Sequence, residues 1–169
     1  LYLHSENIDV TMDSRNSFAH LNNILKQMQA AEPGKKTDVA GTLHRIAESL
    51  RRRALIVVLS DFYDDTHAVI QALAHFRKHH HDVILFHILD PTEIDFPFQK
   101  GARFEDPETG ETLDCDPVAL RASYQRIFAD YMDEYRQAAA SMHIDYRLAR
   151  TDQDLEQFVR AYLDERRKR

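Results

Sequence analysis

Residues 54–90, ALIVVLSDFYDDTHAVIQALAHFRKHHHDVILFHILD, decide the fold because two apolar runs flank an amphipathic segment. The runs at 54–61 and 82–90 are rich in β-branched residues and almost uninterrupted, which is typical of parallel strands covered on both faces. The segment between them repeats apolar residues at helical spacing: Val69, Ile70, Leu73 and Phe76. Strand, helix and strand in this order make a βαβ unit, so we expect both runs to be central strands of a parallel sheet.

The carboxyl-terminal part of the chain continues this alternation. Asp116 and Pro117 pair a helix cap with the residue best suited to the first helical position, so a long helix is predicted to begin there. Its expected core positions are Tyr124, Ile127, Phe128, Tyr131, Met132, Tyr135, Ala139 and Met142. A third strand is predicted at 144–148 and a last helix from about Asp152. That helix is expected to bury Leu155, Phe158, Val159 and Tyr162. The class is therefore α/β with a mainly parallel sheet.

The amino-terminal part has a different rhythm. Residues 1–4 and 8–12 predict two short strands, the second with the alternation of a half-exposed edge strand. The link between them is too short for a parallel return, so we expect them to pair antiparallel. Two helices follow, at 17–30 and 39–50, with the loop EPGKKTD between them.

The acidic stretch RFEDPETGETLDCD at 103–116 predicts a β-hairpin, with Pro107 and Gly110 in its turn. Such a projection is either a partner surface or an inserted loop, and the residues favour neither.

Thr37 and Asp61 are the candidate site residues. Successive elements are expected to run in alternating directions. The loop before the second helix and the corner after the strand at 54–61 should therefore lie on the same rim of the sheet. This rim lies outside the carboxyl ends of the parallel strands, where ligands of open α/β sheets bind. A threonine hydroxyl and a carboxylate are hard oxygen ligands, which suit Mg²⁺ or Mn²⁺. The alternative is that Thr37 or Asp38 caps a helix and Asp61 is a solvated turn residue.

Two further groups of polar residues have simpler explanations. Asp64 and Asp65 precede a helix, where a carboxylate caps free N–H groups and complements the helix dipole. His75 and His79 lie four residues apart, which suggests a transition-metal site, but zinc sites usually take another ligand from a separate element. We therefore expect a solvated helix end there.

Composition and absent motifs exclude several classes of partner and activity. The formal net charge of −6 repels phosphate backbones, so nucleic acid is not expected as a partner. Cys115 is the only cysteine, which suits a reducing compartment. No apolar run is long enough for a membrane span and no signal peptide is evident, so we expect a cytoplasmic location. The signature motifs of dinucleotide binding, of ATP hydrolysis and of the common hydrolases are absent.

Four segments together resemble a known family: LHRIAESLRRRALIVVLSDFYDD, DVILFHILDPTEIDFPF, ARFEDPETGETLDCDP and YRLARTDQDLEQFVRAYL. They resemble the von Willebrand factor A-like domain of a bacterial domain-of-unknown-function family that is associated with MoxR-type AAA+ ATPases. The resemblance implies a Rossmann-like sheet, and residues 1–169 as a single such domain. It also implies a metal-ion-dependent adhesion site, in which Thr37 and Asp61 match the threonine and the second aspartate.

The sequence departs from the family pattern at one place. The DxSxS motif of the adhesion site and the first strand of the sheet are not found. The nearest match, MDSRNS at 12–17, has Arg15 where the first serine belongs, and it follows a strand that runs opposite to the parallel strands. The chain therefore resembles a domain that is truncated at its amino-terminal side. We expect Mg²⁺ or Mn²⁺ to bind weakly or not at all to this chain, and the strand edges left unpaired to close by direct pairing, by swapping or by dimerisation.

The resemblance implies a non-catalytic protein-binding module, with a MoxR-type AAA+ ATPase as its partner in chaperone-like assembly or maturation. The alternative is a metal-dependent hydrolase or phosphoryl-transfer domain that uses Asp61, Asp64 and Asp65.

Overall fold

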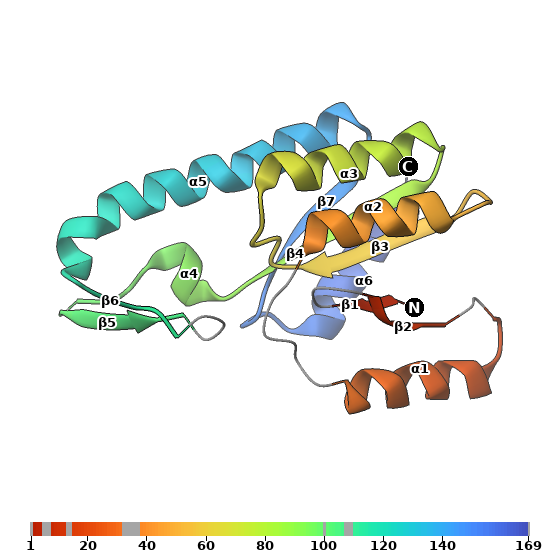
Figure 1. The fold of residues 1–169 in the computed structure, drawn as a ribbon, viewed down its shortest axis with the longest axis horizontal. Coiled ribbons are helices and arrows are strands. Elements are labelled where there is room, and N and C mark those ends of the chain that lie inside the picture. The colour runs from red at the N-terminus through yellow and green to blue at the C-terminus, as the bar shows by residue number, and fades with distance from the viewer. Residues whose placement is uncertain are drawn as a thin grey trace.

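A computed structural model of the chain describes residues 2–4, 8–12, 15–31, 38–99, 101–106 and 110–168. Its centre is a parallel sheet of three strands in the order β3-β4-β7 (Figure 1). The strands are β3 (Leu55–Ser60), β4 (Asp82–Leu89) and β7 (Asp145–Arg150). Both pairings are parallel, with Leu55 opposite Asp82 and Ile84 opposite Asp145. The predicted βαβ unit and third strand are confirmed.

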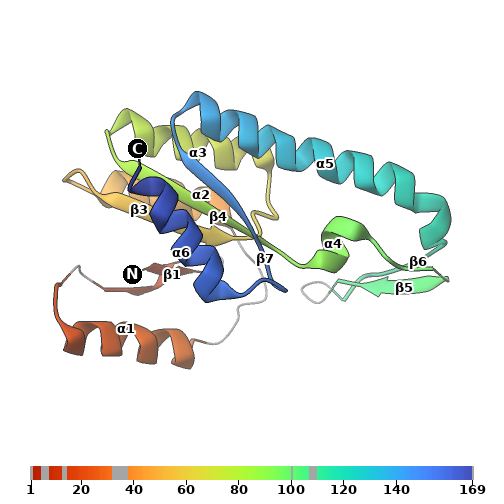
Figure 2. The same ribbon diagram turned by 180° about the vertical axis from the view of Figure 1, so that it is seen from behind.

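Helices cover the sheet on both faces (Figures 1 and 2). One face carries α2 (Val39–Ser49), α3 (Thr66–Lys78) and α5 (Pro117–Ser141), and the other carries α6 (Leu155–Arg166). Each helix begins at a carboxylate that accepts a hydrogen bond from a backbone N–H of its own first turn: Asp38, Asp65, Asp116 and Asp154. The predicted start of α5 at Asp116 and Pro117 is confirmed.

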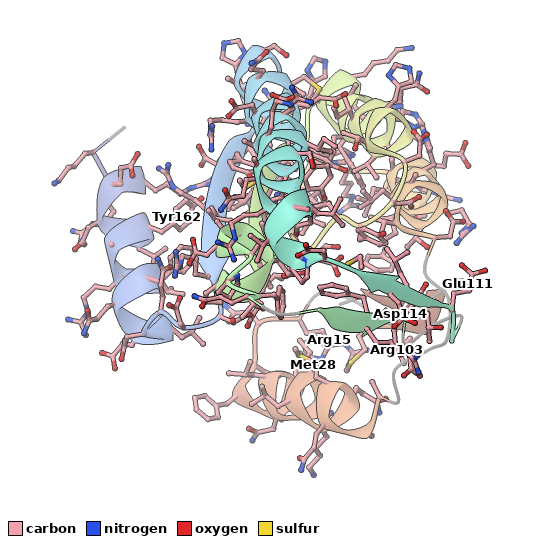
Figure 3. The ribbon with its side chains drawn as sticks, turned by 90° about the vertical axis from the view of Figure 1, so that its left-hand side faces the viewer. Arg15, Met28, Arg103, Glu111, Asp114 and Tyr162 are labelled. Atoms are coloured by element: carbon pink, nitrogen blue, oxygen red, sulfur yellow. The ribbon has the colours of Figure 1, made fainter. Side chains whose placement is uncertain are left out.

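Side chains of β4 alternate between the two faces. Phe86 contacts Phe158 and Tyr162 of α6, and Tyr162 points from α6 toward the sheet, where its hydroxyl lies 3.1 Å from Oδ2 of Asp145 (Figure 3). Leu85 and His87 face the other way and are fully buried. This alternation is the period of two that a strand imposes.

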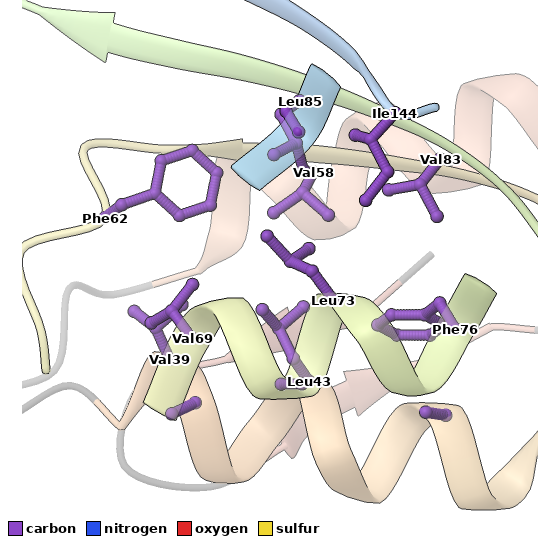
Figure 4. Packing of buried hydrophobic residues seen from close by; sticks show 14 of the residues in the cluster. Val39, Leu43, Val58, Phe62, Val69, Leu73, Phe76, Val83, Leu85 and Ile144 are labelled. Carbon is purple, nitrogen blue, oxygen red and sulfur yellow. The ribbon is translucent and has the colours of Figure 1, made fainter. Parts of the chain in front are cut away.

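The main core lies between the sheet and the pair α2 and α3 (Figure 4). Val58 of β3 faces Leu73 of α3, Phe76 of α3 lies on the side of Val83, and Leu43 of α2 belongs to the same cluster. Leu73 and Phe76 are at most 1% exposed, which confirms the predicted inner face of α3.

β3 differs from its prediction as a central strand covered on both faces. It forms an edge of the sheet, and its outward side chains are exposed: Leu55 by 55%, Val57 by 44% and Leu59 by 63%. The apolar run predicts a strand correctly, but burial also requires a neighbouring strand and a covering helix, and β4 supplies a neighbour on one side only.

The antiparallel strands at the amino end form a sheet of their own. β1 (Tyr2–His4) pairs with β2 (Ile8–Thr11), as predicted, and α1 (Phe18–Ala30) follows. Neither strand is hydrogen-bonded to the three-stranded sheet, so the expected antiparallel edge strand of the main sheet is corrected to a separate pair. Direct pairing of β1 with β3, one expected way of closing the gap, is also absent from the described residues.

The predicted hairpin is confirmed as β5 (Ala102–Glu105) and β6 (Thr112–Cys115), and it projects beyond the carboxyl edge of the sheet (Figure 1). Arg103 and Asp114 form a two-point ion pair across it (Figure 3). Residues 107–109 of its turn lie outside the described residues. A short helix, α4 (Pro91–Asp95), connects β4 to the hairpin and was not predicted.

Three expected core residues are exposed instead. Ile127 of α5 is 63% exposed, and Leu155 and Val159 of α6 line a shallow apolar groove on the surface. On both helices, the apolar face is wider than the part that packs against the sheet. No helix in the described ranges is long and apolar enough to cross a membrane.

Candidate functional site

A sharp corner, residues 61–65, follows β3 at the carboxyl edge of the sheet. Phe62 has a positive φ of 54°, a left-handed conformation that is uncommon for a large side chain. Its ring is nonetheless fully buried and packs against His87 and Tyr135. Such a conformation persists where the surroundings fix it, and it is frequent at functional sites.

Three buried or half-buried side chains hold the backbone of this corner. Nε2 of His87 lies 2.8 Å from the carbonyl oxygen of Asp61. The hydroxyl of Tyr131 lies 2.9 Å from the carbonyl oxygens of both Asp61 and Phe62, and the hydroxyl of Tyr135 lies 3.3 Å from the latter. Because a carbonyl only accepts, His87 donates from Nε2, and its Nδ1 accepts from the hydroxyl of Tyr146 at 2.9 Å.

Burial keeps these anchors uncharged. It lowers the pKa of His87 from 6.5 to about 4, although the nearby backbone and carboxylate of Asp61 act in the opposite direction. Burial likewise raises the pKa of Tyr146 to about 12 and raises the pKa of Tyr131 and of Tyr135 further. A neutral imidazole and neutral phenols are therefore the species that hold the corner near neutral pH.

Asp61 and Tyr63 are presented to solvent on this rigid backbone. The Asp61 carboxylate is exposed, and its Oδ1 accepts from the backbone N–H of Tyr63 at 3.2 Å. The side chain of Tyr63 is 89% exposed. A large, exposed aromatic side chain on a fixed loop is a feature that protein interfaces favour.

Asp65 caps the helix that it precedes, as expected, whereas Asp64 accepts from the first turn of a different helix, α2. Oδ1 of Asp65 accepts from the N–H of Ala68 at 2.7 Å, at the start of α3. Oδ2 of Asp64 accepts from the N–H of Ala40 at 3.1 Å, at the start of α2. Asp64 therefore ties the first turn of α2 to the corner after β3, as the argument from chain direction requires.

Thr37, the other candidate ligand, lies outside the described residues. Its neighbour Asp38 caps α2, with Oδ1 2.7 Å from the N–H of Gly41. Among the residues that the structure describes, no group of three or more His, Cys, Asp and Glu is arranged to hold a metal ion. Asp61 alone is not a metal site, so the described residues do not supply the ligand set that Mg²⁺ requires.

The end of α3, expected to be solvated, is solvated only in part, because His79 and His80 are exposed and the histidine that follows them, His81, is not. His81 is 1% exposed and its Nδ1 accepts from the N–H of Ala54 at 3.1 Å. His75 contacts His44 of α2.

His87 is the residue that the sequence analysis missed. The available signal was a titratable side chain within the apolar strand DVILFHILD, because a buried polar group needs hydrogen-bond partners. Tyr131 and Tyr135 were predicted as core residues, and Tyr135 is buried. Their hydroxyl contacts with the corner depend on tertiary packing.

The fold and the corner define a mixed α/β protein with a polar rim at the carboxyl edge of a parallel sheet. The profile of the family described as "Protein of unknown function DUF58" matches residues 1–134, and the chain belongs to this family. Among its relatives are Uncharacterized protein Rv1480 of Mycobacterium tuberculosis and Uncharacterized protein Mb1516 of Mycobacterium bovis. Each is 27% identical over 145 residues, which cover 83% of this chain and 44% of the relative. The chain thus spans less than half the length of these relatives. No solved structure matches it.

Proposed function

We propose that this chain is a non-catalytic, von Willebrand factor A-like module that binds a protein partner through the rim formed by residues 61–65. The observation that carries the proposal is the corner itself: its backbone carbonyls accept from three anchored donors, while Asp61 and Tyr63 face solvent. A preorganised loop loses little conformational freedom when a partner binds.

The roles of the three carboxylates favour binding over hydrolysis. Asp64 and Asp65 accept backbone N–H groups as caps, so they are committed to holding α2 and α3. Asp61 is exposed and accepts from the N–H of Tyr63 and the hydroxyl of Ser60, neither of which belongs to a helix. Paired carboxylates that activate water need both groups to reach the reacting atoms.

The partner that we propose is a MoxR-type AAA+ ATPase, from the resemblance of the sequence. In the intact protein, Asp61 and Thr37 would contribute oxygen ligands to Mg²⁺ or Mn²⁺. A carboxylate of the partner would complete such a site.

Binding can be measured by biolayer interferometry with the intact protein and a purified MoxR-type ATPase of the same organism, in Mg²⁺ and in EDTA. We expect Tyr63→Ala and Asp61→Ala each to weaken binding by about tenfold or more, as central interface residues do. Asp164→Ala is the matched control, because Asp164 is an exposed carboxylate on α6, and this variant should bind like the wild type. Wild-type affinity of both rim variants, with unchanged circular dichroism, would refute the rim as the binding surface.

A further inference from the structure

Three histidines gather where α2 and α3 lie side by side. His44 belongs to α2, His75 to the last turn of α3, and His79 is the residue that ends α3. Nδ1 of His44 lies 3.5 Å from Nδ1 of His75. The ring centroids of His44 and His75 are 5.7 Å apart, and those of His75 and His79 are 4.9 Å apart. His44 and His75 are half-buried and His79 is exposed, so ions in solution can reach the group.

We propose that His44 and His75 form a transition-metal site for Zn²⁺ or a similar divalent ion, with His79 as its third ligand. Imidazole nitrogens suit Zn²⁺, Ni²⁺ and Cu²⁺, whereas Mg²⁺ takes oxygen ligands. This site is therefore separate from the rim at Asp61, in chemistry as well as in position.

The distance between the two Nδ1 atoms supports a bridging ion. Two nitrogens bound to one tetrahedral Zn²⁺ at about 2.1 Å lie about 3.4 Å from each other. The 3.5 Å between Nδ1 of His44 and Nδ1 of His75 matches this separation. The same distance is long for a hydrogen bond, which is strongest near about 3 Å. The direct contact between the two rings therefore contributes little without an ion.

His79 completes the site when its exposed side chain turns toward the other two histidines. Rings that share a tetrahedral Zn²⁺ have centroids about 5 Å apart, and the two observed separations, 5.7 and 4.9 Å, lie on either side of this value. In the described ranges no three such residues are already arranged around one point, so only His44 and His75 are in place and the exposed ring of His79 must turn. The site lies at the carboxyl end of α3, where the helix dipole favours a cation.

His81 does not belong to this site, although it follows in the same run. Its Nδ1 accepts from the N–H of Ala54, so in the neutral ring Nε2 carries the proton and has no lone pair for a metal. Arg77 does not compete for the position either, because it is committed to the carbonyls of Met142 and His81 and to the carboxylate of Asp82.

The proposal is tested by calorimetric titration of the intact chain with Zn²⁺ in a buffer that does not chelate metals. We expect wild type to bind one Zn²⁺, and His44→Gln and His75→Gln to bind it at least about tenfold more weakly. His67→Gln is the matched control, because His67 lies on the same helix, is exposed and is hydrogen-bonded to Gln71. Its affinity should equal that of the wild type.

His44 is the decisive residue because only the folded chain brings it to His75. The run of three histidines at 79–81 can bind metal in any conformation, and such binding would not depend on residue 44. Equal Zn²⁺ affinity of the wild type and His44→Gln would therefore overturn the proposal. Since residue 44 is half-buried, His44→Asn serves as a second variant if His44→Gln does not fold. Zn²⁺ should also raise the Tm of the wild type by linking α2 to α3, and a Tm that does not respond would overturn the proposal as well.

Discussion

His87 makes the stability of this protein depend on pH, and the structure fixes the sign. Burial lowers the pKa of His87 from 6.5 to about 4 in the folded protein, whereas the unfolded chain keeps the ordinary value. Above pH 6.5 the imidazole is neutral in both states and its contribution to stability is fully present. As the pH falls below 6.5, the unfolded state takes up a proton that the folded state does not, so the free energy of unfolding decreases until the pH passes the folded pKa.

The size of this effect follows from the shift. One pKa unit corresponds to about 1.4 kcal/mol, so a lowering from 6.5 to about 4 amounts to about 3 kcal/mol between neutral pH and pH 4. This is a large part of the stability of an ordinary domain, which is about 5–15 kcal/mol. Other groups titrate in the same range, so the measurement has to isolate His87.

His87→Gln is the matched variant, since glutamine can donate to the carbonyl of Asp61 and accept from Tyr146 but does not titrate. The free energy of unfolding of each protein is measured by urea unfolding at a series of pH values between 4 and 7. Unfolding is followed by circular dichroism, because the chain has no tryptophan. We expect the wild type to lose about 3 kcal/mol more than the variant over this range. Parallel pH profiles of the two proteins would refute the assignment of a neutral, desolvated His87.

Two further results are expected from the packing. Leu73→Ala, in the core between α3 and the sheet, should lower the free energy of urea unfolding by about 2–5 kcal/mol, whereas Leu113→Ala on the exposed hairpin should change it by well under half as much. Equal effects would contradict the core described above. The open edge of β3 should make the chain dimerise, and Val57→Lys should shift size-exclusion profiles toward the monomer. A wild type that elutes as a monomer at every concentration would contradict this expectation.

The elements of the fold could be predicted because their signals are local. Apolar runs give β3 and β4, helical spacing gives α3 and α5, and aspartates mark where these helices begin. The prediction of which apolar residues are buried was wrong at several positions. Leu59, Ile127 and Leu155 are apolar and correctly placed on their elements, yet they are exposed. Whether an apolar residue is covered depends on which elements are adjacent in space, and the sequence of a single strand or helix does not contain that information. The five-residue helix α4 was too short to produce a periodic signal.

The candidate site was predicted only in part, for a related reason. Asp61 and the capping role of Asp65 follow from the order of strand, corner and helix. The contacts of His87 with the corner, and of His44 with His75, join residues that are far apart in sequence. Such contacts appear only once strands and helices are packed, so no local spacing rule could have indicated them.

The central position of β4 has a consequence for how the protein folds during synthesis. Its partner β3 precedes it, but β7 and α6 are synthesised only after the hairpin and the whole of α5. Until then the nascent chain carries β4 with one edge unpaired and Phe86 without its aromatic neighbours. At ordinary rates of translation, the growing chain therefore exposes apolar surface and an unpaired strand edge for several seconds, which is when aggregation is most favoured.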